Sequence, residues 1–360
     1  MKKLLLLGTL SLFTFTIGQP SPATATILFA SGEDTGFTLN GSAAGSTFTG
    51  WRSNFARAAV NITNSATVAD PPANRATTPT FTATSNLWLH AQVNSSGNTT
   101  TANQQTILVR SPDGVSRIVV RETGTAGQLK ISTRNAAGTL TDLATASSTF
   151  ASGGPIPIDL YVNYTCSGSG GVQLYLSGAQ VINYTGNPCT DSATQLNQAD
   201  IAGTNTSSGY WSEIIIADED TRGMSLWTLY PVAAGNTQAW TPSTVGNINK
   251  GVINDATSIG TSSNNALTEW TTPTSAPNGA WNVKAVVQEA RTLVGTSGPL
   301  HFEWLIRTID GSDNVTGSVA PTTSFASYSN QIWATNPHTS SAWSLSDIAS
   351  GFNLGIESLP

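Results

Sequence analysis

The chain has 360 residues, of which only 10% are charged, and its formal net charge at neutral pH is −6. This length predicts two domains of about 130–200 residues each, and a hydrophobic content of 39% with ten tryptophans excludes a disordered chain. Phosphate binding requires clustered Lys and Arg, and the sequence has no basic cluster beyond Lys2 and Lys3, so nucleic acid is excluded as a partner.

The first 25 residues form a segment of their own, in which a basic start is followed by an apolar run at residues 4–17. With the small residues Ala23 and Ala25 behind it, this run has the three parts of a secretory signal. It is shorter than the roughly 20 residues that cross a bilayer, so no stable membrane span is expected. The alternative is an assembly arm that stays on the protein and buries its apolar residues against neighbouring subunits. The residues of that arm are Leu4, Leu5, Leu6, Leu7, Phe13 and Phe15.

From residue 26 to residue 217, short alternating apolar runs are separated by turns rich in Gly, Asn, Ser and Pro. This spacing is typical of a β-sandwich or barrel. No helical period longer than about two turns stands out, and a short helix is expected only at residues 53–59. The predicted strands are 26–30, 87–91, 105–110, 116–121, 128–133, 158–164, 171–176, 180–182 and 212–217.

The two cysteines, Cys166 and Cys189, enclose a predicted strand, turn and strand, so the two ends of this unit can meet. A disulfide that closes such a loop contributes about 3 kcal/mol when it is unstrained. The alternative is a pair of unrelated thiols. A metal site at these cysteines is disfavoured, because no second Cys or His pair completes a ligand set.

The segment WSEIIIADEDTR, at residues 211–222, ends a buried strand in the acidic run Asp218-Glu219-Asp220. It predicts the last strand of one β domain, followed by an acidic hinge. Carboxylates at strand ends are usually solvated turn residues. Carboxylate oxygens on loops can also bind Ca²⁺. A structural Ca²⁺ would use Asp218, Asp220 and Glu33, and no other cofactor is expected.

Residues 223–360 continue as β structure, beginning with MSLWTLYPVAAGNTQAWTP as the first strands of a second domain. Strong strands are predicted at 281–290 and 300–307, facing each other in a second sandwich. Residues 343–348 are interpreted as a turn and residues 352–357 as the final strand. The expected organisation is an apolar segment (1–25), a first β domain (26–222) and a smaller β-sandwich domain (223–360).

Two of these patterns resemble known families. The hairpin pattern at residues 158–181 and the central strand with Trp88 resemble a concanavalin A-like (laminin G-like) jelly roll. The sequence ADEDTRG at residues 217–223 resembles a junction of tailed-bacteriophage virion proteins, in which such a sandwich leads into a second β domain. The ending at residues 337–357 resembles the close of phage fibre and neck-associated proteins. The resemblances imply an all-β fold: a concanavalin A-like jelly-roll sandwich followed by a second, smaller β-sandwich domain.

Catalysis is not expected from this sequence. His90 and His301 lie in predicted strands and His338 in a loop, where structural roles are the ordinary outcome. No G-x-S-x-G nucleophile turn is present, and no predicted strand carries the paired carboxylates of a glycosidase. In the rival interpretation as a glycan-degrading enzyme, Glu33 and Glu213 are the residues to test. Tryptophans near turns could stack on sugars, although positions in the core or at subunit interfaces are more usual.

Taken together, these patterns indicate a virion structural protein of a tailed phage, such as a fibre, spike or surface decoration protein. It would act by association with other virion proteins, as a homo-oligomer, with a host surface glycan as a second expected partner. The rival is a secreted bacterial surface lectin or adhesin whose signal is removed at Ala25. A surface with few charges suits both settings, because it presents little for salt to screen or pH to titrate.

Overall fold

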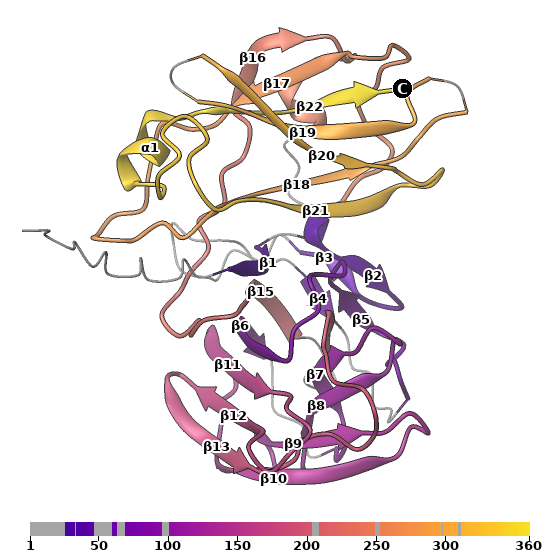
Figure 1. The fold of residues 1–360 in the computed structure, drawn as a ribbon, viewed down its shortest axis with the longest axis vertical. Helices are drawn as coiled ribbons and strands as arrows, with labels where there is room; N and C mark the ends of the chain where they lie inside the picture. Colours follow the sequence, from indigo (N-terminus) through magenta and orange to yellow (C-terminus); the bar gives the residue numbers. More distant parts are fainter. Residues whose placement is uncertain are drawn as a thin grey trace, which may run out of the picture.

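Two units follow one another along the chain, and β-strands dominate both (Figure 1). The computed structural model describes residues 26–32, 34–46, 60–62, 69–95, 101–203, 209–248, 253–296, 298–308 and 311–360. Among these residues, no helix is long and apolar enough to cross a membrane. The predicted helix at 53–59 and the arm residues Leu4, Leu5, Leu6, Leu7, Phe13 and Phe15 lie outside the described residues.

The first unit contains two large antiparallel sheets. One has the order β13–β12–β11–β6–β15–β4–β3, with β1 also paired to β15. Its strands are β1 (Ile27–Ser31), β3 (Ala44–Gly45), β4 (Val60–Ile62), β6 (Asn86–Ser95), β11 (Ile156–Asn163), β12 (Gly171–Leu176), β13 (Ala179–Thr185) and β15 (Gly209–Ala217).

The second sheet of this unit has seven strands in the order β10–β9–β8–β7–β14–β5–β2. They are β2 (Thr38–Asn40), β5 (Arg75–Thr77), β7 (Gln105–Arg110), β8 (Ser116–Glu122), β9 (Gln128–Arg134), β10 (Leu140–Thr149) and β14 (Gln198–Ala202). The short 3-10 turn η1 (Asp34–Gly36) follows β1.

The core of the first unit lies between its two sheets, and strand alternation decides which side chains enter it. On β8, Ile118 and Val120 are buried in the core, whereas Arg117 and Arg121 belong to the opposite face. On β11, Leu160 and Val162 are fully buried in the same core. On β8, the inner face therefore packs in the core, while the outer face carries the two arginines.

The second unit is a smaller sandwich. A five-stranded sheet of order β16–β17–β22–β19–β20 packs on the two-stranded sheet β18–β21, with the aromatic side chains of Trp304, Trp333, Trp343 and Phe352 in the core. The strands are β16 (Ala233–Gln238), β17 (Leu267–Thr271), β18 (Val286–Thr292), β19 (His301–Arg307), β20 (Asp313–Val319), β21 (Ala326–Trp333) and β22 (Asn353–Leu359), with a 3-10 turn η2 (Val245–Asn247). The predicted all-β fold, a sandwich followed by a smaller β-sandwich unit, is confirmed by these sheets.

A buried ion pair joins three strands of this sheet. Glu269 on β17 has no exposed surface, and Arg307 on β19 donates to its two carboxylate oxygens at 2.9 and 3.0 Å. The side-chain amide of Asn353 on β22 donates to the same carboxylate at 2.8 Å. Because both carboxylate oxygens accept hydrogen bonds from these side chains, this charge is compatible with its burial.

Several details differ from the sequence-based expectations. Residues 343–348 were predicted as a turn, but Leu345–Ser350 form helix α1, whose start is a capping box between Ser344 and Asp347. The helix ends at Gly351, where a φ of 74° favours glycine. The strand predicted at 281–290 begins only at Val286, because the preceding stretch pairs with no strand of the described chain.

Polar strands were also missed. β10 has ten residues, LTDLATASST, of which only Ala146 is buried. Such an edge strand has no apolar alternation to reveal it, since one face lies on β13 and the other faces water. The segment 224–232 was predicted to contain strands, but the first strand of the second unit starts at Ala233.

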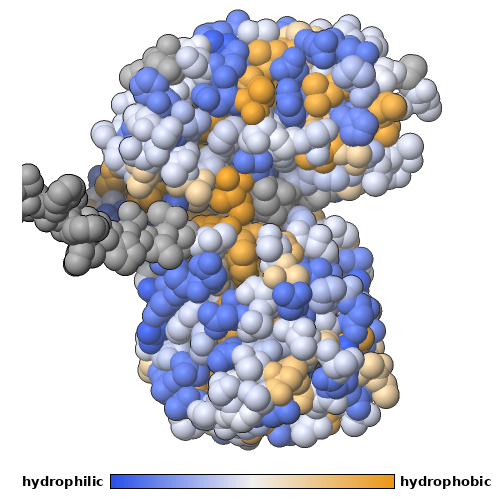
Figure 2. All heavy atoms as spheres, in the orientation of Figure 1, coloured by the Kyte–Doolittle hydropathy of each residue, from blue (hydrophilic) through white to orange (hydrophobic). Residues whose placement is uncertain are grey.

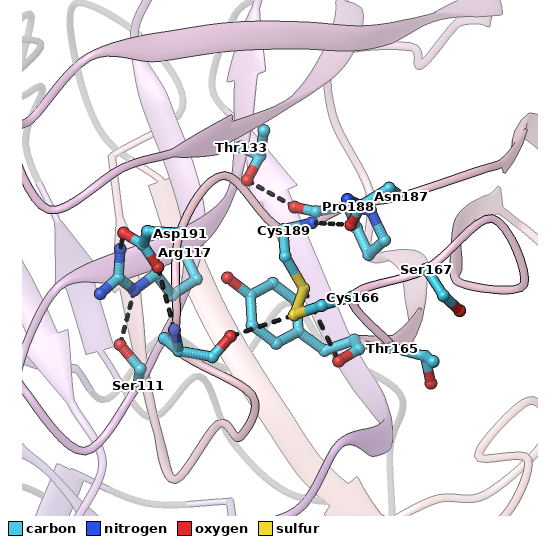
Figure 3. The surroundings of a disulfide bond; sticks show 12 residues. Ser111, Arg117, Thr133, Thr165, Cys166, Ser167, Asn187, Pro188, Cys189 and Asp191 are labelled. Atoms are coloured by element: carbon cyan, nitrogen blue, oxygen red, sulfur yellow. Dashed lines mark hydrogen bonds and ion pairs between the residues drawn. A yellow bond between two sulfur atoms is a disulfide. The ribbon is translucent and has the colours of Figure 1, made fainter.

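A disulfide connects the end of β11 with the loop after β13 (Figure 3). The Cα atoms of Cys166 and Cys189 are 5.1 Å apart, within the usual range for this bond. The same loop reaches the other sheet, because Thr133 donates to the carbonyl of Pro188 at 2.6 Å and Arg117 pairs with Asp191. The disulfide and these polar contacts together fasten one end of the sandwich.

Candidate functional site

The chain between the two units, residues 218–222, folds back on the first unit. The carboxylate of Asp218 accepts a hydrogen bond from the backbone N–H of Thr26 at 2.8 Å, which ties the end of β15 to the start of β1. Glu219 forms an ion pair of 2.9 Å with Lys284 of the second unit. The acidic run is therefore a set of structural contacts between strands and units.

Arg222 lies over an aromatic cluster on the outer face of β6, β11 and β12. Its guanidinium carbon is 4.4 Å from the ring centroid of Tyr175 and 5.2 Å from that of Trp88. The ring of Trp88 is 4.9 Å from Tyr161 and 5.9 Å from Tyr175, centroid to centroid. Asp220 holds the guanidinium through Nε at 2.9 Å, and this hydrogen bond lowers the pKa of Asp220. We call Trp88, Tyr161 and Tyr175 the aromatic platform.

Strand register brings the platform together. Tyr161 is directly opposite Trp88 in the β6–β11 pair, so their rings are cross-strand neighbours. Tyr175 is buried, whereas Trp88 and Tyr161 are half-buried and keep part of their rings at the surface. At the edge of the platform, the hydroxyl of Tyr175 donates to Gln173 at 2.7 Å and accepts from Gln180 at 3.1 Å. Aromatic faces and amide groups therefore occupy one patch.

Next to the platform, a buried hydrogen-bonded group links β6 and β11 to the hinge residue Thr221. Nδ1 of His90 lies 2.7 Å from the carboxylate of Asp159, and both side chains are nearly inaccessible. The hydroxyl of Thr221, with no exposed surface, donates to the same carboxylate at 3.4 Å. Nε2 of His90 has no hydrogen-bond partner in the described part of the chain. These contacts hold the backbone next to Arg222 against β6 and β11.

A cleft of about 1130 Å³ is lined mostly by residues of the second unit and reaches the first unit at β1 and the hinge. Asp220 and Arg222 line it on the first side, and Trp227, Tyr230 and Trp281 are among the aromatic residues on the other. Figure 2 shows apolar side chains gathered at the waist between the units. Clefts of this kind, apolar with a few polar groups and placed between domains, are common ligand sites. Arg222, whose guanidinium covers the platform, is one of the residues that line the cleft.

Near this cleft, apolar side chains of the two units pack against each other. Ile27 and Ala30 of β1 and Ile215 of β15 pack together with Leu226 and Val287 from the second unit. Glu213, at the bulge in β15 with a φ of 51°, accepts a hydrogen bond of 3.3 Å from the backbone N–H of Leu226. The suspected hydrolytic carboxylate Glu213 is thus buried at the junction, with a structural partner.

The outer face of the seven-stranded sheet is closed by its own chain. Asp70 accepts from the backbone N–H of Ser116 at 3.0 Å and forms an ion pair of 2.8 Å with Arg134, which has no exposed surface. Burial lowers the pKa of Arg134, and the carboxylate of Asp70 opposes that effect. Leu108 and Val119 on this face are fully buried. The polar network leaves this sheet face no open groove at these positions.

The predicted calcium ligands have other partners where they are described. Asp218 and Asp220 bind Thr26 and Arg222, and Glu33 lies outside the described residues. In the described part of the chain, no three His, Cys, Asp or Glu side chains are grouped to hold a metal ion. Calcium binding by this set stays a prediction.

The platform was not predicted from the sequence. Trp88 and Tyr161 were placed in strands, but a single strand does not reveal that two of its neighbours contribute rings on the same face. Their alternation with core residues such as Leu89 and Leu160 was the available signal. The position of Arg222 over these rings depends on the folding of the hinge, which no local pattern encodes.

No protein-family model matches the chain, and no curated protein matches its sequence. Among solved structures, the receptor binding domain of botulinum neurotoxin type G is similar at 11% identity and a TM-score of 0.33, over 53% of this chain and 43% of that one. A carbohydrate binding module from Bacillus subtilis matches at 10% identity and 0.33, over 50% and 93%. An endo-β-1,4-glucuronan lyase from the fungus Trichoderma reesei matches at 11% and 0.37, over 54% and 96%. At these scores, the fold assignment rests on the sheets themselves.

Proposed function

We propose that this protein binds a glycan at the aromatic platform and the adjoining cleft, and that it acts as an adhesion or assembly protein without cleaving its ligand. The observation that carries this proposal is the group of Trp88, Tyr161 and Tyr175, with two ring faces partly at the surface and side-chain amides beside them. Aromatic rings pack on the apolar face of a sugar ring, and amides hydrogen-bond its hydroxyls.

The energy available at such a site fits weak, repeated binding. A millimolar site corresponds to about 4 kcal/mol, which does not hold a particle on a cell. Several identical sites in an oligomer raise the avidity by about 10²–10⁴. Adhesion therefore requires a homo-oligomer, and the proposal includes one.

Binding without hydrolysis is supported by the carboxylates at the platform. Asp159 is buried against His90 and Thr221, and Asp220 is held by Arg222. A glycosidase needs two carboxyl groups that reach the glycosidic bond, one of them available to donate a proton. The lowered pKa of Asp220, caused by its hydrogen bond with Arg222, makes it a poor proton donor.

For the biological setting, we propose a structural subunit on the surface of a tailed-phage particle, a fibre, spike or decoration protein with a concanavalin A-like first unit. The resemblance of residues 217–223 and 337–357 to phage virion proteins supports this setting. The second candidate is a secreted bacterial adhesin. The disulfide between Cys166 and Cys189 favours it, because such bonds persist in oxidising compartments.

Binding is tested with the purified chain on a panel of surface-presented oligosaccharides. We expect the wild-type protein to bind at least one glycan and Trp88→Ala to lose about tenfold in affinity, since the ring supplies contact area and stacking. Trp88→Phe keeps a ring at the site and serves as the matched control. Thermal unfolding of each variant separates lost binding from lost folding. Equal binding by Trp88→Ala and the wild type would refute the site.

The setting is tested by the intact mass of the mature protein from its native source. A mass that matches Met1 to Pro360 supports an assembly arm on a virion subunit. A mass that starts at Thr26 supports export and the secreted adhesin.

A further inference from the structure

The second unit has an open strand edge. Its five-stranded sheet packs on only two strands, β18 and β21, which lie between that sheet and the first unit (Figure 1). β18 pairs with β21 along one edge, and no strand of the described chain pairs with its other edge. Such an edge presents a row of backbone N–H and C=O groups that can accept a further strand.

The cleft runs along this edge. Residues 280–295, which include all of β18, line it, whereas no residue of β21 whose side chain is described does so. Of the seven residues of β18, only Gln288 is buried, although the strand lies between the five-stranded sheet and the first unit. The cleft is therefore the open side of β18.

A second stretch of chain lines the same cleft. Residues 223–231 line it without a gap, and they belong to none of the described strands. Met224, Leu226 and Leu229 in this stretch are only half-buried. The volume of about 1130 Å³ exceeds the roughly 300–1,000 Å³ of small-molecule pockets. The cleft therefore has room for a segment of polypeptide between apolar walls.

The chain carries a segment whose pattern suits this place. Residues 9–17 have the sequence TLSLFTFTI, in which apolar and hydroxyl residues alternate at 9–12 and again at 13–17. Such alternation is typical of a strand with one apolar face, here Phe13, Phe15 and Ile17. Nine residues in a strand span about 30 Å, which is enough to follow β18 along its whole length.

The start of the described chain brings this segment within reach. The backbone N–H of Thr26 donates to Asp218, and the next residue, Ile27, lines the cleft. Residues 18–25 separate the segment from Thr26 and span up to about 28 Å when extended. A segment on so short a tether has an effective concentration in the millimolar range. This favours the chain's own segment over a separate partner.

We propose that residues 9–17 add to the free edge of β18 in their own copy of the protein, as a further strand with its apolar face in the cleft. The backbone hydrogen bonds of strand addition supply affinity, and the apolar side chains supply specificity. The arm then belongs to its own copy and not to a neighbouring subunit. Lys284, just before β18, is paired with Glu219 of the hinge, so the strand leaves the hinge end of the cleft open. Glycan binding at the platform does not depend on this strand.

Photo-crosslinking locates the segment. The full chain, Met1 to Pro360, is prepared with benzoylphenylalanine in place of Phe15 and irradiated at low protein concentration, and the attached peptides are identified by mass spectrometry. We expect attachment to residues 223–231 or 280–295 of the same chain. Attachment elsewhere in the chain, attachment to a second copy, or no attachment overturns the proposal.

Hydrogen exchange on the full chain provides a second readout. The backbone amides of residues 9–17 and of β18 should exchange slowly, and Phe15→Asp should accelerate exchange in both by about tenfold or more, because burial of one Phe side chain contributes about that factor. Ser21→Asp adds the same charge outside the segment and should leave both rates unchanged. Exchange in β18 that does not respond to Phe15→Asp would contradict the added strand. A mature protein whose mass starts at Thr26 lacks the segment and also overturns the proposal.

Discussion

The raised pKa of a buried carboxyl group in the first unit predicts how the stability of the protein changes with pH. Glu122 ends β8 on the same face as Ile118 and Val120, which lie in the core. It has no exposed surface, and its two carboxylate oxygens have no hydrogen-bond partner in the described part of the chain. Burial raises the pKa of Glu122 to about 8, from an ordinary value of 4.5.

The sign of the effect follows from linkage. Because the folded pKa exceeds the unfolded one, the stability that Glu122 provides is complete below pH 4.5 and is lost as the pH rises towards 8. A tenfold change in an ionisation constant corresponds to about 1.4 kcal/mol, so the wild type loses roughly 3 kcal/mol between pH 5 and pH 8 through this group. Glu122→Gln carries no such charge and should not show this loss.

The assay is urea unfolding of both proteins at pH 5 and pH 8 and constant ionic strength. Relative to the wild type, Glu122→Gln should gain about 3 kcal/mol on going from pH 5 to pH 8. Asp142→Asn is a control that should differ from the wild type by the same amount at pH 5 and pH 8, because Asp142 is ionised in the folded and the unfolded protein throughout this range. Although partial burial raises the pKa of Asp142, hydrogen bonds from Ser132, Lys130 and Arg121 lower it to about 2. A difference between Glu122→Gln and the wild type that is the same at both pH values would refute the burial argument.

Three further changes test other parts of the molecule. Asp70→Ala leaves the buried guanidinium of Arg134 without its ion pair and should cost about 3 kcal/mol in urea unfolding; Asp70→Asn, which keeps the shape, should cost less. Reduction of the Cys166–Cys189 disulfide should lower the free energy of unfolding by about 3 kcal/mol, and a Cys-to-Ser double variant should show the same loss and no response to reductant. Glu269→Ala should lower the unfolding temperature of the second unit, measured by calorimetry, because it removes the buried carboxylate that accepts hydrogen bonds from Arg307 and Asn353; an unchanged transition would contradict this.

The sequence was sufficient where strands have a clear apolar pattern. β12 coincides with a predicted segment because its apolar residues alternate, and β7, which is buried on both faces, coincides with one because its apolar run at residues 107–109 lies between turn signals. It was insufficient for β10, whose polar residues carry no alternation, and for α1, whose six residues are too few to establish a helical period. The capping box of α1 was nevertheless present in the sequence as Ser344 followed three residues later by Asp347, so this helix start could have been predicted.

The platform marks a different kind of limit. Local patterns assign side chains to faces of a strand, but the neighbours of a strand depend on sheet order. β6 pairs with β11, which follows it by more than sixty residues along the chain, and this pairing sets Trp88 against Tyr161. The acidic hinge was recognised as a junction, but the contacts of its carboxylates with Thr26 and Lys284 were not predicted, because these partners are distant in sequence.

The hinge also explains why the site and the junction coincide. The hydroxyl of Thr221 donates to Asp159 at the outer face of β11. This contact places the next residue, Arg222, over the rings of that face. The same contacts set where the second unit begins and which residues line the cleft. A ligand that displaces the guanidinium from the platform would therefore loosen one of the contacts between the units, whereas a ligand that stacks beside it on Trp88 and Tyr161 would leave the junction intact. Because Arg222 is held by both the rings and Asp220, stacking beside it requires the smaller change.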